Sequence, residues 1–303
     1  MSASLLSPEL RQQFRRATVA AARAASTRVG GGDGDAVDLA AVTALRAEFA
    51  GIAVAGRIIA GEGEKDEAPM LPAGELFGTG GPEVDIAVDP VDGTRLAAAG
   101  LPGSMVVVAV AGRGAFAEIG SAFYAEKFIA SGRVPGLSLA DPLGETILKI
   151  ARARGVDTGA VRVAIQDRPR NAEAIAAVRA AGAECVLFEH GDVERGLNIL
   201  HEDSPVDLLV GIGGAPEALI VAGAARALGG QMQVRLAPQS RGERARLGRE
   251  GIAVDRVLGL DELCAGPAAI FVTAVTDCDI VPGSPMGGVS GSGLEEKIWS
   301  WGA

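Results

Sequence analysis

Acidic side chains are concentrated at both ends of the stretch 62–94, which is the part of the sequence best equipped for chemistry. Glu62 and Glu64 stand near its beginning, and Asp89 and Asp92 near its end. Carboxylates that gather at strand ends and in loops bind hard divalent cations such as Mg²⁺, which take oxygen ligands in an octahedral arrangement. The pattern therefore predicts a divalent metal site in this part of the 303-residue chain.

The turn 89–94, which reads DPVDGT, can bind a metal and an anion at once. Gly93 permits a positive φ or a close backbone approach. Asp89, Asp92 and the carbonyl of Val91 can then converge on one ion. Thr94 follows at an expected helix start, where exposed N–H groups favour an anion such as phosphate. The alternative interpretation is an ordinary strand-to-helix turn in which an Asp caps the helix.

The same turn resembles the metal-binding signature of the lithium-sensitive phosphatase superfamily, which includes inositol monophosphatases and fructose-1,6-bisphosphatases. The stretches 61–71, 84–89 and 211–217 make the chain similar to the class II, bacterial-type fructose-1,6-bisphosphatases, and the resemblance runs from about residue 14 to about residue 276. It implies an α/β (α+β) fold, a layered αβαβα sandwich. It also implies metal-dependent hydrolysis of a sugar bisphosphate, namely fructose 1,6-bisphosphate to fructose 6-phosphate and phosphate.

The resemblance further implies three groups of site residues. The metal ligands are Asp38, Glu62, Asp89, the Val91 carbonyl, Asp92 and Glu217, which hold two or three Mg²⁺ or Mn²⁺ ions. The catalytic residues are Asp66 and Thr94, which activate the attacking water, and Glu62, which bridges the metals. The substrate-binding residues are Asp92, Gly93, Thr94, Tyr124, Arg168, Arg170, His190, Gly191, Asp192 and Gly214.

Several of these residues also have an ordinary structural interpretation. Asp38 is placed to cap the helix that follows it, and Glu217 is an acid in the first turn of another helix. Tyr124 can be a core aromatic residue with its hydroxyl at the surface. Arg168 and Arg170 follow a strand end and suit a phosphate that is not cleaved, because arginine grips phosphate through a planar fork. The alternative is that both arginines are solvated.

Four positions and one segment depart from the class II pattern. The family usually has Lys where this chain has Gly34 and Arg168, Asp where it has His190, and Glu where it has Asp92. Asp92 matches the wider superfamily, so metal binding is expected to survive that change. The C-terminal segment 294–301, which holds both tryptophans, does not match.

These departures keep three functions open. The first is a fructose-1,6-bisphosphatase that also accepts sedoheptulose 1,7-bisphosphate. The second, motivated by Gly34 and His190, is a phosphatase for another phosphorylated sugar or a cyclitol in a biosynthetic pathway. The third is a relative that binds sugar phosphates without turnover, and the intact set of clustered acids argues against it, because like charges held together destabilise the compact state.

Turn signals and hydrophobic periodicity predict how the first half of the chain positions these residues. Ser7-Pro8-Glu9 marks a helix start, and apolar residues recur at helical spacing up to residue 24. A second helix is expected from 39 to 49, with Asp38 as its N-cap. Strands are predicted at 56–60, 84–89 and 105–111, and a strand at 115–120 is expected to pair with the last of these across the turn 112–114.

From about residue 155 the pattern changes to alternating strands and helices, typical of α/β topology with functional loops at the carboxyl ends of strands. Strands are predicted at 161–165, 184–188, 206–211 and, as the last one, 268–275, and helices at 171–181 and 218–228. A boundary near 153–158 divides the chain into an α+β metal-binding domain, 1–155, and an α/β domain that completes the substrate site, 156–303. The Arg-rich segment 231–256 is predicted to be an exposed helical arm at a subunit interface, and 282–293 to be flexible.

Composition limits the class of protein. The net charge of −10 argues against non-specific nucleic-acid binding, which needs a basic surface. Apolar residues make up 48% of the chain but aromatic residues only 4%, so the core must consist of Ala, Val, Leu and Ile. Three scattered cysteines fit a reducing cytoplasm, and neither a signal peptide nor a membrane span is expected. We expect a cytoplasmic homodimer or homotetramer whose partner is a small sugar phosphate.

Overall fold

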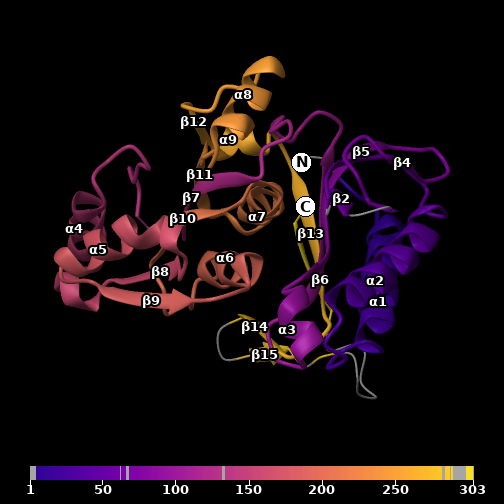
Figure 1. Cartoon of the computed structure of the whole chain (residues 1–303), viewed down its shortest axis with the longest axis horizontal. Coiled ribbons are helices and arrows are strands. Elements are labelled where there is room, and N and C mark those ends of the chain that lie inside the picture. The colour runs from indigo at the N-terminus through magenta and orange to yellow at the C-terminus, as the bar shows by residue number, and fades with distance from the viewer. Residues whose placement is uncertain are drawn as a thin grey trace.

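The chain folds into layers in the order helix, sheet, helix, sheet, helix (Figure 1). A computed structural model describes residues 5–61, 63–65, 68–131, 134–281, 284–286, 288 and 298–302. The outer helices on the first sheet are α1 (Pro8–Ser26) and α2 (Gly34–Phe49), the middle helices are α6 (Asp192–Leu200) and α7 (Ala215–Leu228), and the outer helices on the second sheet are α4 (Leu143–Arg154) and α5 (Ala172–Ala180). The predicted α/β fold with an αβαβα sandwich is confirmed.

The first sheet carries the turn 89–94. In spatial order its strands are β16 (Ile298–Gly302), β13 (Ala268–Ala274), β6 (Met105–Gly112), β5 (Glu83–Asp92), β1 (Ala55–Ala60) and β4 (Leu76–Phe77). β1 runs parallel to β5, and the other neighbours are antiparallel. The predicted strands 56–60, 84–89 and 105–111 therefore lie side by side at the centre of this sheet.

The second sheet carries the arginine-containing loops. In spatial order its strands are β12 (Val257–Gly259), β11 (Gln231–Leu236), β7 (Tyr124–Ala130), β10 (Leu208–Gly214), β8 (Arg162–Gln166) and β9 (Glu184–Phe188). β10, β8 and β9 are parallel to one another, so the loops that follow them leave from the same edge of the sheet. The remaining neighbours are antiparallel.

Short elements complete the described chain. The helices are α3 (Thr94–Ala99), α8 (Arg241–Arg249) and α9 (Leu260–Leu263), with 3-10 turns at Thr158–Ala160 and Pro169–Asn171. Two small hairpins pair β2 (Gly63–Lys65) with β3 (Ala68–Met70) and β14 (Cys278–Val281) with β15 (Ser284–Met286). None of the helices in the described ranges has both the length and the apolar run that crossing a bilayer requires.

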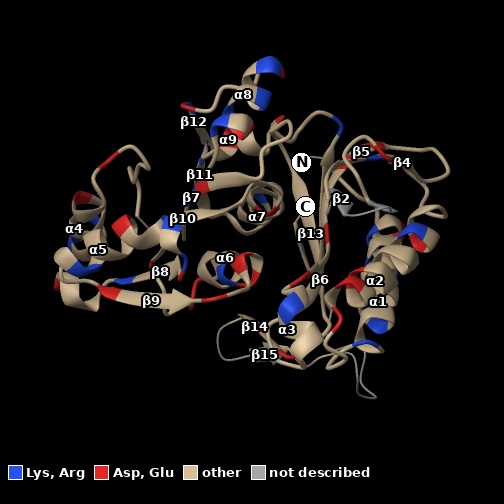
Figure 2. Ribbon diagram, viewed as in Figure 1, with Lys and Arg blue, Asp and Glu red and all other residues tan. Residues whose placement is uncertain are grey.

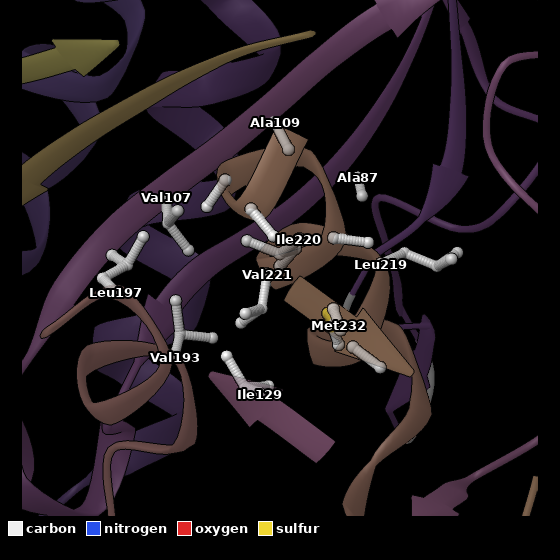
Figure 3. Close-up of a cluster of buried hydrophobic side chains, with 14 of the residues drawn as sticks. Ala87, Val107, Ala109, Ile129, Val193, Leu197, Leu219, Ile220, Val221 and Met232 are labelled. Carbon is white, nitrogen blue, oxygen red and sulfur yellow. The ribbon is translucent and has the colours of Figure 1, made fainter. Parts of the chain in front are cut away.

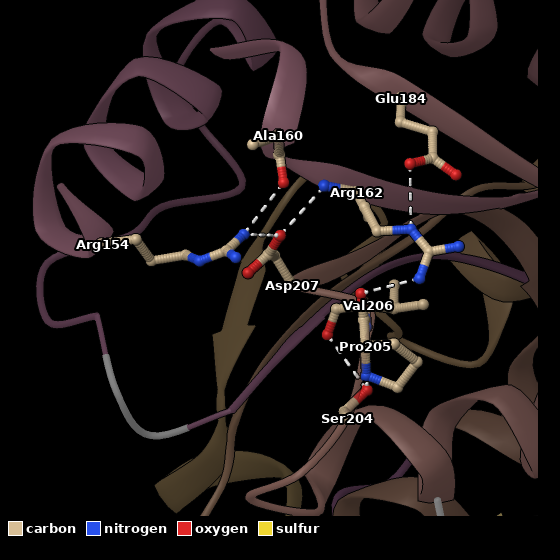
Figure 4. Close-up of polar contacts among 8 residues, drawn as sticks. All are labelled: Arg154, Ala160, Arg162, Glu184, Ser204, Pro205, Val206 and Asp207. Atoms are coloured by element: carbon tan, nitrogen blue, oxygen red, sulfur yellow. Dashed lines mark hydrogen bonds and ion pairs between the residues drawn. The ribbon is translucent and has the colours of Figure 1, made fainter. Parts of the chain in front are cut away.

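The segment around the predicted domain boundary is tied to the second sheet by polar contacts (Figure 4). Asp207 Oδ2 accepts hydrogen bonds from Arg154 Nη1 at 2.6 Å and from the backbone N–H of Arg162 at 2.9 Å. Arg162 also pairs with Glu184 on the neighbouring strand. Each large sheet takes strands from both sides of residue 155, and the division into two domains stays a prediction.

The N-terminal helices begin where polar side chains can satisfy their first N–H groups. Ser7 Oγ accepts from Leu10 N at 3.3 Å, which confirms the predicted start of α1. α2 begins earlier than predicted, because Asp33 Oδ1 accepts from Ala36 N at 3.0 Å. The prediction that Asp38 is the N-cap was therefore wrong. Asp38 lies inside α2 and is fully buried.

Small aliphatic side chains fill the layer between the two sheets, as the low aromatic content predicts (Figure 3). Around α7 the core residues come from both sheets and from α6, namely Ala87, Val107, Ala109, Ile129, Met232, Val193 and Leu197. Gly223 of α7 packs so closely on the first sheet that a Cβ there would lie 2.8 Å from the Cβ of Ala109. This approach brings Glu217, in the first turn of α7, close to the turn 89–94, where its charge acts on Asp92.

The expected strand at 115–120 does not form. Both edges of β6 are already paired, with β5 on one side and β13 on the other, so no edge is left for it. The segment instead makes a single bridge, from Phe116 to Cys264, on its way to the second sheet.

Two further predictions for the C-terminal half were wrong. The segment 231–256 is not an exposed arm, because β11 is an interior strand of the second sheet and Leu247 of α8 is buried. β13 is not the last strand, because β16 pairs with it. Ser300 of β16 accepts hydrogen bonds from Arg15 of α1, so this part of the C-terminal segment closes the edge of its own sheet. The predicted flexible stretch 282–293 lies largely outside the described residues.

Candidate active site

A cavity of about 910 Å³ lies between the end of β5 and the loops that follow β8, β9 and β10. It brings together thirteen of the predicted site residues: Asp38, Asp89, Asp92, Gly93, Thr94, Tyr124, Arg168, Arg170, His190, Gly191, Asp192, Gly214 and Glu217. Figure 2 shows acidic segments on α6 and on the facing strands of the first sheet, with a basic segment beside them on α3. Glu62 and Asp66 lie outside the described residues.

The end of β5 and the turn into α3 direct two carboxylates toward the cavity. Asp89 Oδ1 accepts from the backbone N–H of Val91 at 3.0 Å, which holds the carboxylate over the turn. Gly93 has φ +80°, and a Cβ there would lie 2.7 Å from the carbonyl oxygen of Gly103, so only glycine fits. The pairing of β5 with β6 shifts between Asp89 and Asp92, and both acids consequently reach the cavity.

The Thr94 hydroxyl has two acceptors within hydrogen-bond distance. Its Oγ1 lies 2.9 Å from Asp38 Oδ1 and 2.8 Å from the carbonyl oxygen of Val91. Val91 does not itself line the cavity, and its carbonyl faces Thr94. Gly34 lies against the same residue, since a Cβ at that position would be 3.1 Å from Thr94 Cγ2. The N-terminal part of α2 and the start of α3 therefore meet at this hydroxyl.

Asp92 and Glu217 carry buried oxygen atoms that suit a cation. Within the described residues, neither Asp92 Oδ2 nor Glu217 Oε2 has a hydrogen-bond partner. Burial raises the pKa of Asp92 well above its ordinary value, and Glu217, Asp192 and Glu194 raise it further, against the opposing charge of Lys127. A buried carboxylate without a partner is unfavourable unless a cation neutralises it.

The donors present fit a hard divalent cation, although they do not by themselves form a closed site. Among the described residues, no three acidic, His or Cys side chains converge closely enough to hold a metal. The predicted ligands Asp38, Asp89, Asp92 and Glu217, here called the acidic wall, nevertheless all line the cavity and offer only oxygen. Gly214 shapes this wall, because a Cβ there would lie 1.8 Å from Glu217 Oε2.

Arg168 and Arg170, here called the basic wall, line the same cavity from the loop after β8, and the protein backbone fixes them. Arg168 donates to the carbonyl oxygen of Glu189 at 2.7 Å, and Arg170 donates to that of Ile212 at 2.8 Å. Arg170 also donates to Gln166 Oε1 at 2.7 Å, and its guanidinium lies 5.0 Å from the centre of the Tyr124 ring. These contacts aim two planar cations into the cavity before any ligand arrives.

The surroundings of His190 favour the neutral form of its ring. Burial lowers the pKa of its ring, and the charges of Arg168 and Arg95 lower it further. Its Nδ1 lies 3.4 Å from Arg168 Nη2, which can only donate, so Nδ1 is the acceptor and Nε2 carries the hydrogen. The ring therefore presents a neutral donor beside the two arginines.

Some residues at the site are not predicted by the sequence pattern. Arg95, Gln166 and Phe123 line the cavity, and Lys127 is buried behind it. Lys127 had a visible signal, since it interrupts the apolar strand YAEKFIA. The sequence around Gln166 gives no such signal. Gln166 acts by accepting a hydrogen bond from Arg170, and that contact depends on the conformation of the loop after β8.

Known proteins resemble this chain over most of its length. Residues 8–290 match the family model described as bacterial fructose-1,6-bisphosphatase, glpX-encoded. The chain is 38% identical over 284 residues to fructose-1,6-bisphosphatase 2 class 2 of Escherichia coli, which is 88% of either chain. It is 38% identical over 287 residues to fructose-1,6-bisphosphatase class 2 of Haemophilus influenzae, covering 89% of this chain and 86% of the relative. A second Escherichia coli protein, fructose-1,6-bisphosphatase 1 class 2, is 36% identical over 290 residues, 91% of this chain and 86% of the relative.

Proposed function

This chain belongs to the family of bacterial, glpX-encoded fructose-1,6-bisphosphatases, and on that premise we propose that it hydrolyses fructose 1,6-bisphosphate to fructose 6-phosphate and phosphate. As a member of this family it is a phosphoric monoester hydrolase, a metal-dependent phosphatase that acts on a sugar phosphate in carbohydrate metabolism. The observation that carries the proposal is that acidic oxygens and guanidinium groups line the same cavity. A bisphosphate needs both walls, one for each end.

The acidic wall is the proposed site of phosphate release. Asp38, Asp89, Asp92 and Glu217, with Glu62 from outside the described residues, would hold two or three Mg²⁺ or Mn²⁺ ions. Bound there, the metal ions supply Lewis acidity toward the transferred phosphoryl group and lower the pKa of a coordinated water. Uncatalysed hydrolysis of phosphate monoesters is among the slowest reactions, and acceleration of up to ~10²¹-fold is known for them.

Thr94 orients the attacking water. Its hydroxyl hydrogen is directed at Asp38 or at the Val91 carbonyl, each within 2.9 Å. A lone pair of Oγ1 is then left to accept a hydrogen bond from a water in the cavity. Asp66, which lies outside the described residues, is the proposed general base for that water.

The basic wall holds the rest of the substrate. Arg168 and Arg170 would bind the phosphate that is not cleaved, through charge-assisted hydrogen bonds. Tyr124 and Asp192 face the same cavity and would contact the sugar, where His190 adds a neutral donor. Gly93, Gly191 and Gly214 line the cavity without side chains and leave room for the ligand.

A second candidate function rests on His190. In the resemblance described above, the family usually has Asp at this position, so this chain offers a donor where an acceptor is usual. A phosphatase for another phosphorylated sugar or a cyclitol would use this difference to read a different pattern of hydroxyls. Sedoheptulose 1,7-bisphosphate is the nearest alternative, because it also carries a phosphate at each end.

The first experiment is phosphate release from fructose 1,6-bisphosphate with Mg²⁺ or Mn²⁺, with Asp89→Asn as the control. Turnover by the wild type that disappears in the variant supports both the reaction and the acidic wall. Absence of turnover with this substrate, but turnover of another sugar phosphate in a panel, would replace the first candidate by the second.

We also propose that the protein is cytoplasmic and forms a homodimer or homotetramer. Size-exclusion chromatography with light scattering would test the oligomeric state.

A further inference from the structure

Lys127 is a buried cation directly behind the active-site cavity. It lies in β7 between Ala125 and Ile129, and these alternate residues face the apolar layer that contains α6 and α7. Its side chain is 1% exposed, and its Nζ forms an ion pair with Asp192 Oδ2 from the first turn of α6. The ammonium group has three hydrogens to donate, but no other described residue accepts a hydrogen bond from it.

The pair is enclosed by a glycine. A Cβ at Gly213 of β10 would lie 2.2 Å from Asp192 Oδ2 and 3.2 Å from Lys127 Nζ. The backbone of β10 therefore passes so close to the ion pair that a larger residue would displace the carboxylate. Gly213 does not have a positive φ, so its backbone conformation does not require glycine. The close contact with the ion pair is the reason that a larger residue does not fit.

The pair leaves one end of Asp192 available to a ligand. Asp192 lines the cavity, and its side chain is 13% exposed. Oδ2 is engaged by Lys127, whereas Oδ1 has no hydrogen-bond partner within the described residues. A carboxylate held at one oxygen by a rigid cation presents the other oxygen in a fixed position, which is what recognition of a sugar hydroxyl requires.

Stability alone does not account for this arrangement. Burying an ion pair is frequently neutral or unfavourable compared with apolar residues of similar size, because both charges lose their hydration. The surrounding layer is apolar, so a methionine in place of Lys127 would suit it.

We propose that Lys127 is a positioning residue that holds Oδ2 of Asp192 so that Oδ1 accepts a hydrogen bond from one hydroxyl of the sugar. This inference rests on the proposed function, because it assumes that a sugar phosphate occupies the cavity. Lys127 touches no reacting atom, and it acts through Asp192. The residue thereby helps to decide which sugar is accepted, whereas the metal ligands decide whether phosphate is released.

The test compares wild type and Lys127→Met on fructose 1,6-bisphosphate and on its monodeoxy analogues. For the wild type, KM should rise on the order of tenfold for the analogue that lacks the recognised hydroxyl. Lys127→Met should raise KM for the parent substrate by about the same factor, with a smaller change in kcat, and the analogue should then suffer no further loss. The analogue penalty is the rise in KM for the deoxy analogue relative to the parent substrate. An unchanged KM for the parent substrate in the variant would overturn the proposal, and so would an analogue penalty that the variant retains. So would a wild type that distinguishes none of the analogues.

Gly213→Ala tests the same contact without removing a charge, and it replaces Lys127→Met if that variant does not fold. The methyl group of the new alanine should displace Asp192 Oδ2, so the variant should lose the difference in KM between the analogue and the parent substrate. If the variant keeps that difference, the proposal is contradicted. Lys149→Met is the matched control, since Lys149 pairs with Asp141 at the surface, and Gly112→Ala is the control for the glycine. Both controls should keep the wild-type KM.

Failure of the proposed function would be visible separately. If the wild type releases no phosphate from fructose 1,6-bisphosphate, that function is wrong, and the same comparison is made with the sugar phosphate that the enzyme does hydrolyse. If the wild type is active and Lys127→Met has an unchanged KM, only the role of Lys127 is wrong.

Discussion

The two walls of the cavity are prepared for a ligand in opposite ways. On the basic wall the guanidinium groups of Arg168 and Arg170 already have partners, which are the main-chain carbonyls of Glu189 and Ile212. On the acidic wall, within the described ranges, Asp92 Oδ2 and Glu217 Oε2 are buried and have none. The basic wall is therefore complete as a protein structure, and the acidic wall needs cations to be complete.

The difference follows from where the charges lie. The arginines project from loops at the edge of the second sheet, where carbonyl oxygens are available and water has access. Asp92 lies at the end of β5, where burial raises its pKa. Binding of sugar phosphate should therefore depend mainly on the basic wall, and turnover and its metal dependence mainly on the acidic wall.

The largest expected effect is the loss of turnover on the acidic wall. Glu217→Gln should lower kcat/KM on the order of 10³-fold, because it removes one charged oxygen from the proposed metal site. Steady-state kinetics at saturating Mn²⁺ would measure the loss. Glu184→Gln, which removes a half-exposed acid paired with Arg162, is the control and should keep full activity. A Glu217→Gln enzyme with more than a tenth of wild-type turnover would remove this residue from the site.

A change on the basic wall should affect binding more than turnover. Arg170→Ala removes charge-assisted hydrogen bonds worth about 1.5–3 kcal/mol, so KM should rise about 10- to 150-fold while kcat falls less. Measurement of KM and kcat for a bisphosphate and for the matching monophosphate would locate the contact, since only the bisphosphate should lose affinity. Arg244→Ala, which has one exposed partner, is the control. Equal losses for both substrates would contradict the assignment to the phosphate that is not cleaved.

Asp92 should make the metal-free protein less stable as pH rises. Its pKa is raised in the folded state, so the folded chain binds the proton more tightly than the unfolded chain. The free energy of unfolding therefore falls as pH rises from the ordinary value of 3.8 through the raised value, and the loss is complete above it. Asp92→Asn should remove this slope and stabilise the metal-free protein at neutral pH by about 1–3 kcal/mol.

Urea unfolding with a chelator at several pH values measures that difference. Metal should narrow this difference, since Mg²⁺ or Mn²⁺ at about 100 times its Kd stabilises the wild type by about 2.7 kcal/mol. The variant should gain less, and the gain of the wild type should shrink at low pH, where protons compete with the metal. A variant that is no more stable than the wild type under chelation would show that Asp92 has a partner in solution.

The smallest expected effect concerns His190. Because its ring is neutral, His190→Ala removes an ordinary hydrogen bond of about 0.5–1.5 kcal/mol, and KM should rise two- to tenfold with kcat nearly unchanged. The control is His201→Ala, since the sequence contains only these two histidines and His201 lies away from this cavity. A change in the order of preferred sugar phosphates, and not only in KM, would favour the second candidate function.

Local signals in the sequence were sufficient for much of the fold. The start of α1 at Ser7 and Pro8, the turn 89–94 and the strands β6 and β9 depend on neighbouring residues, and each was predicted near its observed position. The strand expected at 115–120 failed because pairing depends on which edges remain open, and β13, far along the chain, occupies the edge of β6. The same reason explains why β16 was missed.

The residue types that are available for chemistry can be identified from the sequence, because acids, glycines and arginines at turns have a recognisable spacing. Which of these residues contact one another depends on the folded structure. Asp38 is read locally as a cap, yet it is buried against Thr94, 56 residues away. Lys127 is read as one charge in a strand, yet it lies against Asp192, 65 residues away. Such contacts depend on how the layers pack, and packing brings together residues whose separation along the chain carries no signal.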